Sequence, residues 1–281
     1  MIRLALRVDR AHAEVALAEL LELAPGGVEE VDLGAAGVEY AVYGPPGELP
    51  ALPDVRAAVG GALVEVRTDE LPDDWSERWK RFHRPLVLDG PAGPWLAVRP
   101  PWEAPIGAAV ELVVDPGQAF GTGAHATTRL CLELLLELAD GAAPVRGPLL
   151  DLGCGSGVLA IAAAKLGCAP VIAADHDPLA VEAARANATA NGVALDVRRA
   201  DLRADPIPAA PTVLANLLLP LLLDYAAALG TGRAPEPPRT LIASGLLTHE
   251  ADEVAAAFAP HGLREHARRE RGEWAALLLT R

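Results

Sequence analysis

Residues 151–157, Asp-Leu-Gly-Cys-Gly-Ser-Gly, constrain the fold of this chain more than any other feature. They follow the apolar pair Leu149-Leu150, which is typical of the end of a buried strand. They precede an apolar, alanine-rich run at 158–166 that predicts a helix. Glycine permits positive φ angles and a close approach of the backbone to a ligand. The stretch therefore predicts a strand, a turn that cradles a ligand, and a helix.

The spacing of the glycines indicates which ligand this turn binds. A dinucleotide fingerprint has the spacing G-x-G-x-x-G, whereas the glycines here are Gly153, Gly155 and Gly157. Asp151 lies two residues before the first of them. An acid at that point suits a cation better than a phosphate. S-adenosylmethionine (SAM) carries a sulfonium, an ammonium and no phosphate, so we expect SAM as the cofactor.

Two further acids follow the next two predicted strands. Asp175 ends the strand at 171–175, where its carboxylate could accept both ribose hydroxyls. Asp201 follows the strand at 195–200 and could lie near the adenine. A glycine run alone would also fit an ordinary turn between a strand and a helix. The run together with two acids at consecutive strand ends favours SAM.

Composition limits the remaining possibilities. Hydrophobic residues make up 51% of the 281 residues, which is enough for a sizeable core. No apolar run reaches membrane-spanning length and the N-terminus lacks a secretory signal, so we expect a cytoplasmic protein. The three cysteines form no CxxC pair and the seven histidines show no HxxxH spacing, so we expect no disulfide framework and no metal. The net charge of −14 disfavours duplex nucleic acid and suits a basic protein substrate, although it also fits solubility alone.

Residues 1–68 form a separate predicted unit. Sequence periodicity predicts strands at 2–8, 28–33, 38–43 and 62–67, and helices at 11–23 and 52–59. This βαββαβ order indicates a ferredoxin-like α+β domain. Residues 69–85 follow as a linker helix with Trp75, Trp79 and Phe82 on one side. Either these rings pack between two domains or the neighbouring basic residues contact the substrate.

Residues 86–281 form the second predicted domain, a Rossmann-like α/β fold in which strands alternate with helices. We expect strands at 95–99 and 110–114 before the main sheet, and strands at 240–244 and 274–279 near its end. A glycine-rich loop at 115–128 includes Phe120 and Gly121 and is a candidate lid over the cofactor. Thr127 is a candidate N-cap of the helix expected at 129–138, a role that can coexist with a ligand contact.

The second chemical element is Asn216, a polar residue at the carboxyl end of an apolar strand that begins at 213. Amine methyltransferases often place an Asn-Pro-Pro-aromatic turn at this point, whose oxygens accept hydrogen bonds from the target N–H groups. This chain keeps the asparagine and lacks both prolines and the aromatic residue. Asn216 either only caps the turn or orients an amine near the methyl group, and its position favours the second role.

Several motifs together resemble the bacterial ribosomal protein L11 methyltransferase family. They are Asp-Trp-Ser-Glu-Arg-Trp-Lys at 74–80, the loop at 115–128, the glycine run within 150–162, Ala-Asn-Leu at 215–217, Ser-Gly-Leu at 244–246 and Glu-Trp at 273–274. The Phe-Gly-Thr-Gly-x-His-x-Thr-Thr loop is far more specific than the glycine run, which many SAM enzymes share. The chain departs from the family in a Pro- and Gly-rich segment at 231–239 and in its N-terminal domain.

The resemblance implies a class I SAM-dependent methyltransferase domain preceded by a domain that recognises the ribosomal protein, free or ribosome-bound. It implies methylation of lysine ε-amines and the N-terminal α-amine of L11. From the net charge and the lack of a long apolar run, we expect no sequence-specific contact to nucleic acid and no membrane partner. Four matching positions carry over as cofactor contacts: Thr127, Gly153, Asp175 and Asn216. The loop, the glycine run and the strand ends add Phe120, Gly121, Asp151, Gly155 and Asp201.

The expected reaction is in-line displacement of the sulfonium methyl by a neutral amine. Lysine, with a pKa of about 10.4, must first lose a proton. His125 and His176 are the nearest candidate bases, and a structural role fits each better, so we expect orientation by Asn216 to dominate. Three alternatives stay open: methylation of another protein such as the electron-transfer flavoprotein β subunit, methylation of a small molecule, and a non-catalytic SAM-binding scaffold. The glycine spacing disfavours a dinucleotide oxidoreductase.

Overall fold

The computed structural model divides the chain into two compact units, Met1–Phe82 and His83–Arg281, and each is described by itself. The described residues are 2–13, 16–17, 20, 28–34, 37–44, 49, 63–70, 84–90, 93–115, 125–140, 146–234 and 236–281. The helix predicted at 52–59 lies outside them, as do residues 71–83 of the expected linker helix with its three aromatic side chains.

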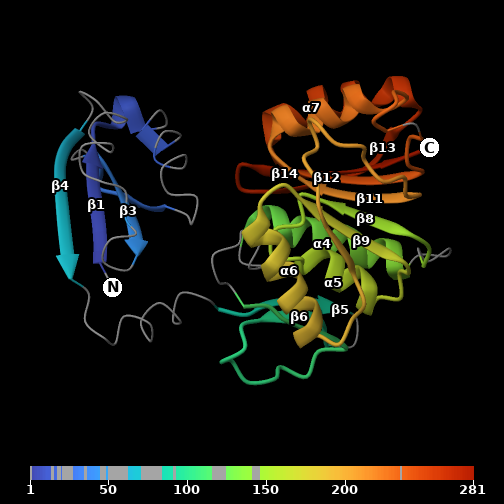
Figure 1. The fold of residues 1–281 in the computed structure, drawn as a ribbon, viewed down its shortest axis with the longest axis horizontal. Coiled ribbons are helices and arrows are strands. Elements are labelled where there is room, and N and C mark those ends of the chain that lie inside the picture. The colour runs from blue at the N-terminus through green and yellow to red at the C-terminus, as the bar shows by residue number, and fades with distance from the viewer. Residues whose placement is uncertain are drawn as a thin grey trace. The chain divides into compact units, whose positions relative to one another are not determined.

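The N-terminal unit contains one antiparallel sheet of four strands: β1 (Ile2–Val8), β2 (Glu29–Asp32), β3 (Val38–Gly44) and β4 (Leu63–Glu70). Their order is β2-β3-β1-β4, of which Figure 1 labels β3, β1 and β4. Alternate residues of β1, among them Leu4 and Leu6, face a core that also contains Tyr40 of β3 and the helical residue Leu20. This strand order confirms the ferredoxin-like prediction. Because β4 reaches Glu70, the first two residues expected in the linker helix belong to a strand.

The larger unit is built on a sheet of seven strands (Figure 1). They are β8 (Leu149–Leu152), β9 (Val171–Asp175), β10 (Asp196–Arg199), β11 (Thr212–Asn216), β12 (Thr240–Leu247), β13 (Arg264–Arg271) and β14 (Trp274–Thr280). The spatial order is β10-β9-β8-β11-β12-β14-β13. The first five strands in this order run parallel, and β14 is antiparallel to both of its neighbours. The Rossmann-like prediction is confirmed.

In the described part of this unit, five α-helices accompany the sheet: α4 (Ala126–Asp140), α5 (Val158–Lys165), α6 (Pro178–Ala190), α7 (Leu219–Ala228) and α8 (Ala251–Phe258). Residues of α4, α5 and α6 pack in one apolar cluster, and residues of α7 and α8 pack in another. Successive residues of one strand face different clusters, as Leu149 and Leu150 do in β8. The central strands are therefore buried on both faces, which explains their continuous apolar sequences. In the described part of the chain, no helix is long and apolar enough to span a membrane.

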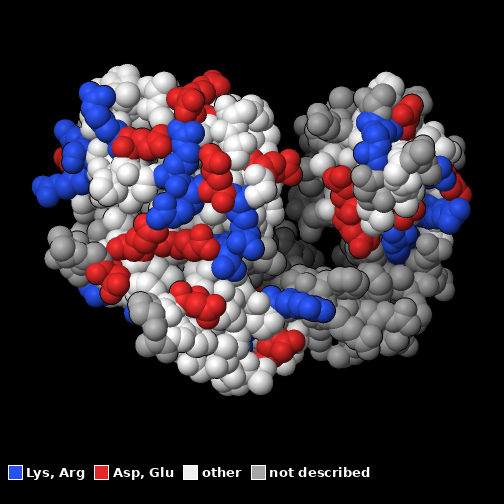
Figure 2. All heavy atoms as spheres, turned by 180° about the vertical axis from the view of Figure 1, so that it is seen from behind, with Lys and Arg blue, Asp and Glu red and all other residues white. Residues whose placement is uncertain are grey.

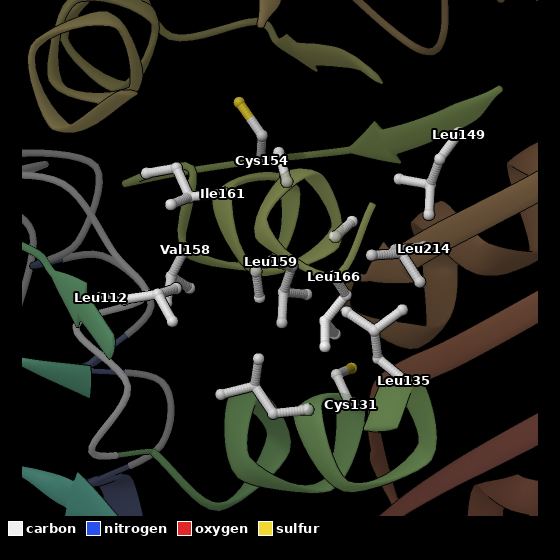
Figure 3. Close-up of a cluster of buried hydrophobic side chains, with 14 of the residues drawn as sticks. Leu112, Cys131, Leu135, Leu149, Cys154, Val158, Leu159, Ile161, Leu166 and Leu214 are labelled. Atoms are coloured by element: carbon white, nitrogen blue, oxygen red, sulfur yellow. The ribbon is translucent and has the colours of Figure 1, made fainter. Parts of the chain in front are cut away.

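Figure 3 shows side chains of the apolar cluster that contains α4, α5 and α6, called the first cluster below. Cys131 and Leu135 of α4 point toward Leu159 and Leu166, which belong to α5 and its C-terminal end. All four residues are at most 7% exposed. Cys131 and the other two cysteines are buried free thiols. The cluster fixes α5, and therefore the glycine turn before it, against the sheet.

Strand β13 was not predicted, because its sequence, Arg-Glu-His-Ala-Arg-Arg-Glu-Arg, has no apolar alternation. It lies at the edge of the sheet, where charged side chains discourage pairing with other chains. Arg268 pairs with Asp252 at 2.6 Å, and Arg269 pairs with Glu137. On the face shown in Figure 2, acidic and basic side chains are interspersed rather than segregated.

A third sheet contains β5 (Leu86–Gly90), β6 (Gly93–Arg99) and β7 (Val110–Val113) in that order. It includes the two strands expected before the main sheet, and β5 was not predicted. Leu96 and Leu112 of this small sheet belong to the same apolar cluster as α4 and α5. The small sheet is therefore part of the larger unit's core and leads directly into the loop that starts at Asp115.

Candidate functional site

The carboxyl ends of β8 and β11 lie side by side at the centre of the larger sheet. The helix after β8 is α5, which packs in the first cluster, and the helix after β11 is α7, which packs in the second. Helices that leave neighbouring strands toward opposite faces open a crevice between the strand ends, and ligands bind there. The glycine turn after β8 and Asn216, the last residue of β11, therefore meet at this crevice.

The turn after β8 requires glycine for both its conformation and its packing. Gly153, Gly155 and Gly157 have φ angles of 72°, 52° and 80°, a region that favours glycine. A Cβ atom at residue 153 would lie 2.3 Å from Cδ2 of Leu217, and one at 157 would lie 3.0 Å from Cβ of Ala184. The turn therefore presents backbone rather than side chains to the crevice.

Asp175, the last residue of β9, connects this turn to the next strand. Its Oδ2 accepts a hydrogen bond from the Gly155 N–H at 2.9 Å, and its Oδ1 accepts one from the Asp177 N–H at 3.0 Å. These two bonds fix the carboxylate, which is 8% exposed. Each oxygen keeps a further lone pair. A carboxylate held in this way suits two adjacent hydroxyls, such as those of a ribose.

A hollow of about 310 Å³ opens beside these residues. That volume lies at the lower end of the range for small-molecule sites, ~300–1,000 Å³. Three predicted cofactor residues line it together: Gly153, Asp175 and Asp201. Leu217 and Leu221 contribute an apolar wall. The structure thus brings the ends of β8, β9 and β10 and the start of α7 around one space.

Asp151 lies beneath the glycine turn and does not line the hollow. It is 1% exposed, and its Oδ2 accepts a hydrogen bond from the Ala160 N–H at 3.0 Å. Among the described residues, its Oδ1 has no hydrogen-bond partner. Burial, with a smaller contribution from the charge of Asp175, raises the pKa of Asp151 to about 7. A cation near the turn would stabilise the charged form of this carboxylate.

Asn216 ends β11 opposite Ser244 of β12. Its side-chain Oδ1 is buried, and no donor reaches it from the described part of the chain. The Oγ atom of Thr128 is in the same situation. Buried polar atoms are nearly always hydrogen-bonded in proteins, so each exception needs an explanation. An amine donor from a substrate would satisfy the oxygen of Asn216.

Thr127 lies in the first turn of α4, because this helix begins at Ala126 and not at 129. The prediction that Thr127 is the N-cap is therefore wrong. Its Oγ1 lies 2.8 Å from Nδ1 of His125, and its carbonyl oxygen accepts a hydrogen bond from Ser244 Oγ at 3.4 Å. The His125 ring packs edge-on against Trp274 at 4.9 Å, and burial lowers the pKa of His125. Phe120 and Gly121 lie outside the described residues.

Two asparagines, one in α6 and one at its C-cap, support the site and were not identified from the sequence. Asn187 donates from Nδ2 to the Ser156 carbonyl at 2.9 Å and accepts at Oδ1 from the Asp115 N–H at 3.0 Å. Asn191, one helical turn later, bonds both the N–H and the carbonyl of Val113. Together they connect the glycine turn to the segment that enters the 115–128 loop. The two asparagines are four residues apart in an alanine-rich helical sequence, which places both on one side of the helix. This spacing could have identified them as polar residues with a shared role.

The structure gives no separate indication of a metal centre. Within the described ranges, no group of three or more His, Cys, Asp or Glu side chains is arranged to hold a metal ion. Asp175 and Asp201 supply acceptor oxygens to the hollow, which suit a cationic or hydroxyl-rich organic ligand, and His176 and Arg203 also line it.

Comparisons with known proteins agree with this geometry. The family model described as ribosomal protein L11 methyltransferase (PrmA) matches residues 56–281. The ribosomal protein L11 methyltransferase of Symbiobacterium thermophilum is 38% identical over 236 residues, which cover 81% of this chain and 72% of the relative. That of Pseudomonas aeruginosa is 41% identical over 217 residues, which cover 76% of this chain and 70% of the relative.

Among solved structures, the ribosomal protein L11 methylase of Lactobacillus delbrueckii subsp. bulgaricus is similar to this chain with a TM-score of 0.57 and 31% identity. The similarity covers 66% of this chain and 94% of that protein. These comparisons confirm the resemblance drawn from the motifs.

We expect Asn187→Ala to loosen the glycine turn. The substitution leaves the Ser156 carbonyl and the Asp115 N–H without their partner, so unfolding free energy should fall by about 2 kcal/mol. Hydrogen exchange in peptides covering 151–158 should become faster. Asn191→Ala is the matched control, since Asn191 bonds Val113 and not the turn. Equal hydrogen-exchange rates for these peptides in the two variants would contradict the role of Asn187 in holding the glycine turn.

Proposed function

Because the chain belongs to the ribosomal protein L11 methyltransferase family, we propose that it transfers methyl groups from SAM to ribosomal protein L11. The acceptors are lysine ε-amines and the N-terminal α-amine. One observation carries the proposal. The buried Oδ1 of Asn216 has no partner among the described residues, and it lies at the strand edge that also holds the glycine turn. Since the acceptor is a ribosomal protein, we place the reaction in the cytoplasm.

The residues present fit SAM. Asp151 lies beneath the glycine turn, and its buried carboxylate, whose Oδ1 lacks a partner in the described structure, would stabilise the positive charge of the cofactor through the turn. Asp175 presents a fixed carboxylate to the ribose hydroxyls, and Asp201 lines the same hollow on the adenine side. Gly153 and Gly155 let the backbone approach closely. Thr127, together with Phe120 and Gly121 of the preceding loop, completes the proposed contacts.

Bound SAM supplies an electrophilic methyl group on a sulfonium. The chain's own contribution is to bind the amine, orient it and exclude water. Asn216 Oδ1 accepts a hydrogen bond from the amine N–H, which directs the nitrogen lone pair toward the methyl carbon. An apolar wall that includes Leu217 and Leu221 disfavours the charged ammonium and so lowers the amine pKa.

The two candidate bases have other roles. Nδ1 of His125 is engaged with Thr127, and its ring packs on Trp274. The side chain of His176 is 78% exposed and lies 3.3 Å from Asp175. A base is most effective when it is held at the proton it abstracts. Loss of the amine proton to solvent as the amine enters the apolar site, followed by orientation at Asn216, is therefore the mechanism that we propose.

Protein recognition is assigned to the ferredoxin-like unit, with the charged segment after it as linker. The net charge of −14 supports a basic protein as partner, because opposite charges accelerate encounter. No membrane surface or sequence-specific nucleic acid contact is part of the proposal.

Purified full-length protein should transfer labelled methyl groups from SAM to purified L11. Mass spectrometry should locate the label on lysine ε-amines and on the N-terminal amine. Electron-transfer flavoprotein β subunit and a metabolite extract serve as alternative acceptors. Label on either of these and none on L11 would refute the proposed target. Binding of S-adenosylhomocysteine without turnover on any acceptor would instead indicate a scaffold.

Asn216→Ala should separate cofactor binding from chemistry. Affinity for S-adenosylhomocysteine, measured by calorimetry, should stay within about threefold, because the glycine turn and Asp175 are intact. Turnover of L11 should fall by about 100-fold, since the amine is no longer oriented. Asn216→Asp keeps an acceptor oxygen at the same place and should retain more activity than the alanine variant. Full activity in Asn216→Ala would remove this residue from the mechanism.

Cofactor affinity should depend on pH through Asp151. Burial raises the pKa of this carboxyl to about 7, so in the free protein it is protonated below that pH. A cation favours the charged form, and affinity should therefore weaken as pH falls below about 7, by up to ~10-fold per pH unit. Calorimetry in two buffers of different ionisation enthalpy should detect proton release at about pH 6.5. In Asp151→Asn the affinity for SAM should be nearly constant over this pH range. If the affinity of this variant depends on pH as strongly as that of the wild type, Asp151 is not the titrating group.

A further inference from the structure

Leu217, the residue after Asn216, lies between two glycines, one in the turn after β8 and one in β12. On one side, a Cβ at residue 153 would come within 2.3 Å of Leu217 Cδ2. On the other side, a Cβ at residue 245 would come within 2.5 Å of the Leu217 carbonyl oxygen and 2.8 Å of its N and C atoms. Real Cβ atoms are essentially never found closer than about 3.0 Å to such atoms. The side chain of Leu217 therefore fills the space at one glycine, and its backbone fills the space at the other.

The glycine at 245 lies at an irregularity of β12. The register between β12 and β14 shifts between Ser244 and Leu246, so Gly245 is the extra residue of a bulge, with a φ angle of 84°. The Leu217 N–H donates to the Ser244 carbonyl at 2.9 Å just before this bulge. Bulges redirect a strand and are common beside active sites. Here the bulge makes room for the chain that carries Asn216 out of β11.

The contacts of Leu217 restrict the turn after β11 in place of the prolines that this chain lacks there. In an Asn-Pro-Pro-aromatic turn, proline fixes φ near −65° and so restricts the turn from within. This chain has Leu217 and Leu218 at the proline positions. Leu218 is 64% exposed and supplies little packing. Pro220 restricts the backbone only from the first turn of α7 onward, so Leu217 is the packed side chain of the turn itself, and it also lines the hollow beside Gly153.

We propose that Leu217 is a positioning residue, wedged between Gly153 and Gly245, that holds the Asn216 amide at the correct depth beside the cofactor. The inference rests on the proposed function, because it assigns how the amine acceptor of that reaction is oriented. Leu217 acts through Asn216 and through the glycine turn, so it links the position of the acceptor amine to the position of the cofactor.

Leu217→Ala tests this role by removing the contact at Gly153 while leaving the backbone in place. With SAM and L11 as substrates, kcat should fall at least ~10-fold while KM for SAM changes less than ~3-fold. Leu217→Met keeps the side-chain volume and should restore most of kcat. A crystal structure of Leu217→Ala should show the Asn216 amide displaced by about 1 Å.

Leu229→Ala controls for lost stability. Leu229 is 4% exposed at the C-terminal end of α7, in the cluster against which Leu217 packs, and it is remote from the crevice. This variant should be destabilised and keep the wild-type kcat below its melting temperature. Gly153→Ala introduces a collision with the Leu217 side chain. Its effect on kcat should therefore be smaller in a Leu217→Ala background than in the wild-type protein.

Unchanged kcat in Leu217→Ala, or strictly additive effects with Gly153→Ala, would overturn the inference. If wild-type protein does not methylate L11, the proposed function fails by itself. The wedge is then judged on the crystal structure of Leu217→Ala, in which an undisplaced Asn216 would refute it.

Discussion

Burial of the central strands on both faces decides where polar chemistry can occur in the larger unit. Helices cover both sides of β8 and β11, so residues along these strands alternate between two apolar clusters. A polar side chain placed there without partners would lose several kcal/mol of hydration, ~2–7 by transfer measurements. Polar groups are therefore concentrated where the strands end. Asp175 ends β9 and Asn216 ends β11, and both lie at the edge where the backbone turns away from the sheet.

Asp151 is a charged exception to this distribution, because it lies inside β8 and is almost completely buried. A buried carboxylate disfavours the native state when it is charged. Folding raises the pKa of Asp151 to about 7, so the native state binds the carboxyl proton more tightly than the unfolded state does. This proton binding stabilises the native state at low pH, and the stabilisation is lost as pH rises through about 7. The cost persists at neutral pH unless a cation compensates it. A ligand that places a cation near Asp151 would therefore stabilise the native state.

The sequence predicted those parts of the site that depend on backbone conformation or on strand ends. Gly153, Gly155 and Gly157 have the positive φ angles that the run implied, and Asp175 and Asn216 occupy the predicted strand ends. Their contacts with cofactor and substrate stay predictions. Both folds were correctly derived from periodicity. Strand β13 was missed because an edge strand needs no apolar alternation when charged side chains face solvent.

The other omissions share a physical reason: they depend on side chains that meet across the fold. Asn187 reaches Ser156 over a sequence separation of 31 residues and reaches Asp115 over 72. The start of α4 was placed too late, because Thr127 and Thr128 resemble capping residues although both are buried within the first turn. Local sequence indicates which backbone conformations a segment prefers. These contacts form only when distant segments pack together, so local sequence does not predict them.

The turn after β11 shows the consequence for the site. Proline would hold such a turn in its shape in any surroundings, including the unfolded chain. A wedge of Leu217 between Gly153 and Gly245 holds it only while β8, β11 and β12 are assembled. Local opening of any of these strands would release Asn216, so site geometry and fold stability are coupled more tightly here than in a proline-bearing turn. In exchange, the same leucine contacts the cofactor cradle directly. A change in the glycine turn on cofactor binding can therefore reach Asn216, the residue proposed to orient the amine, through a single packed side chain.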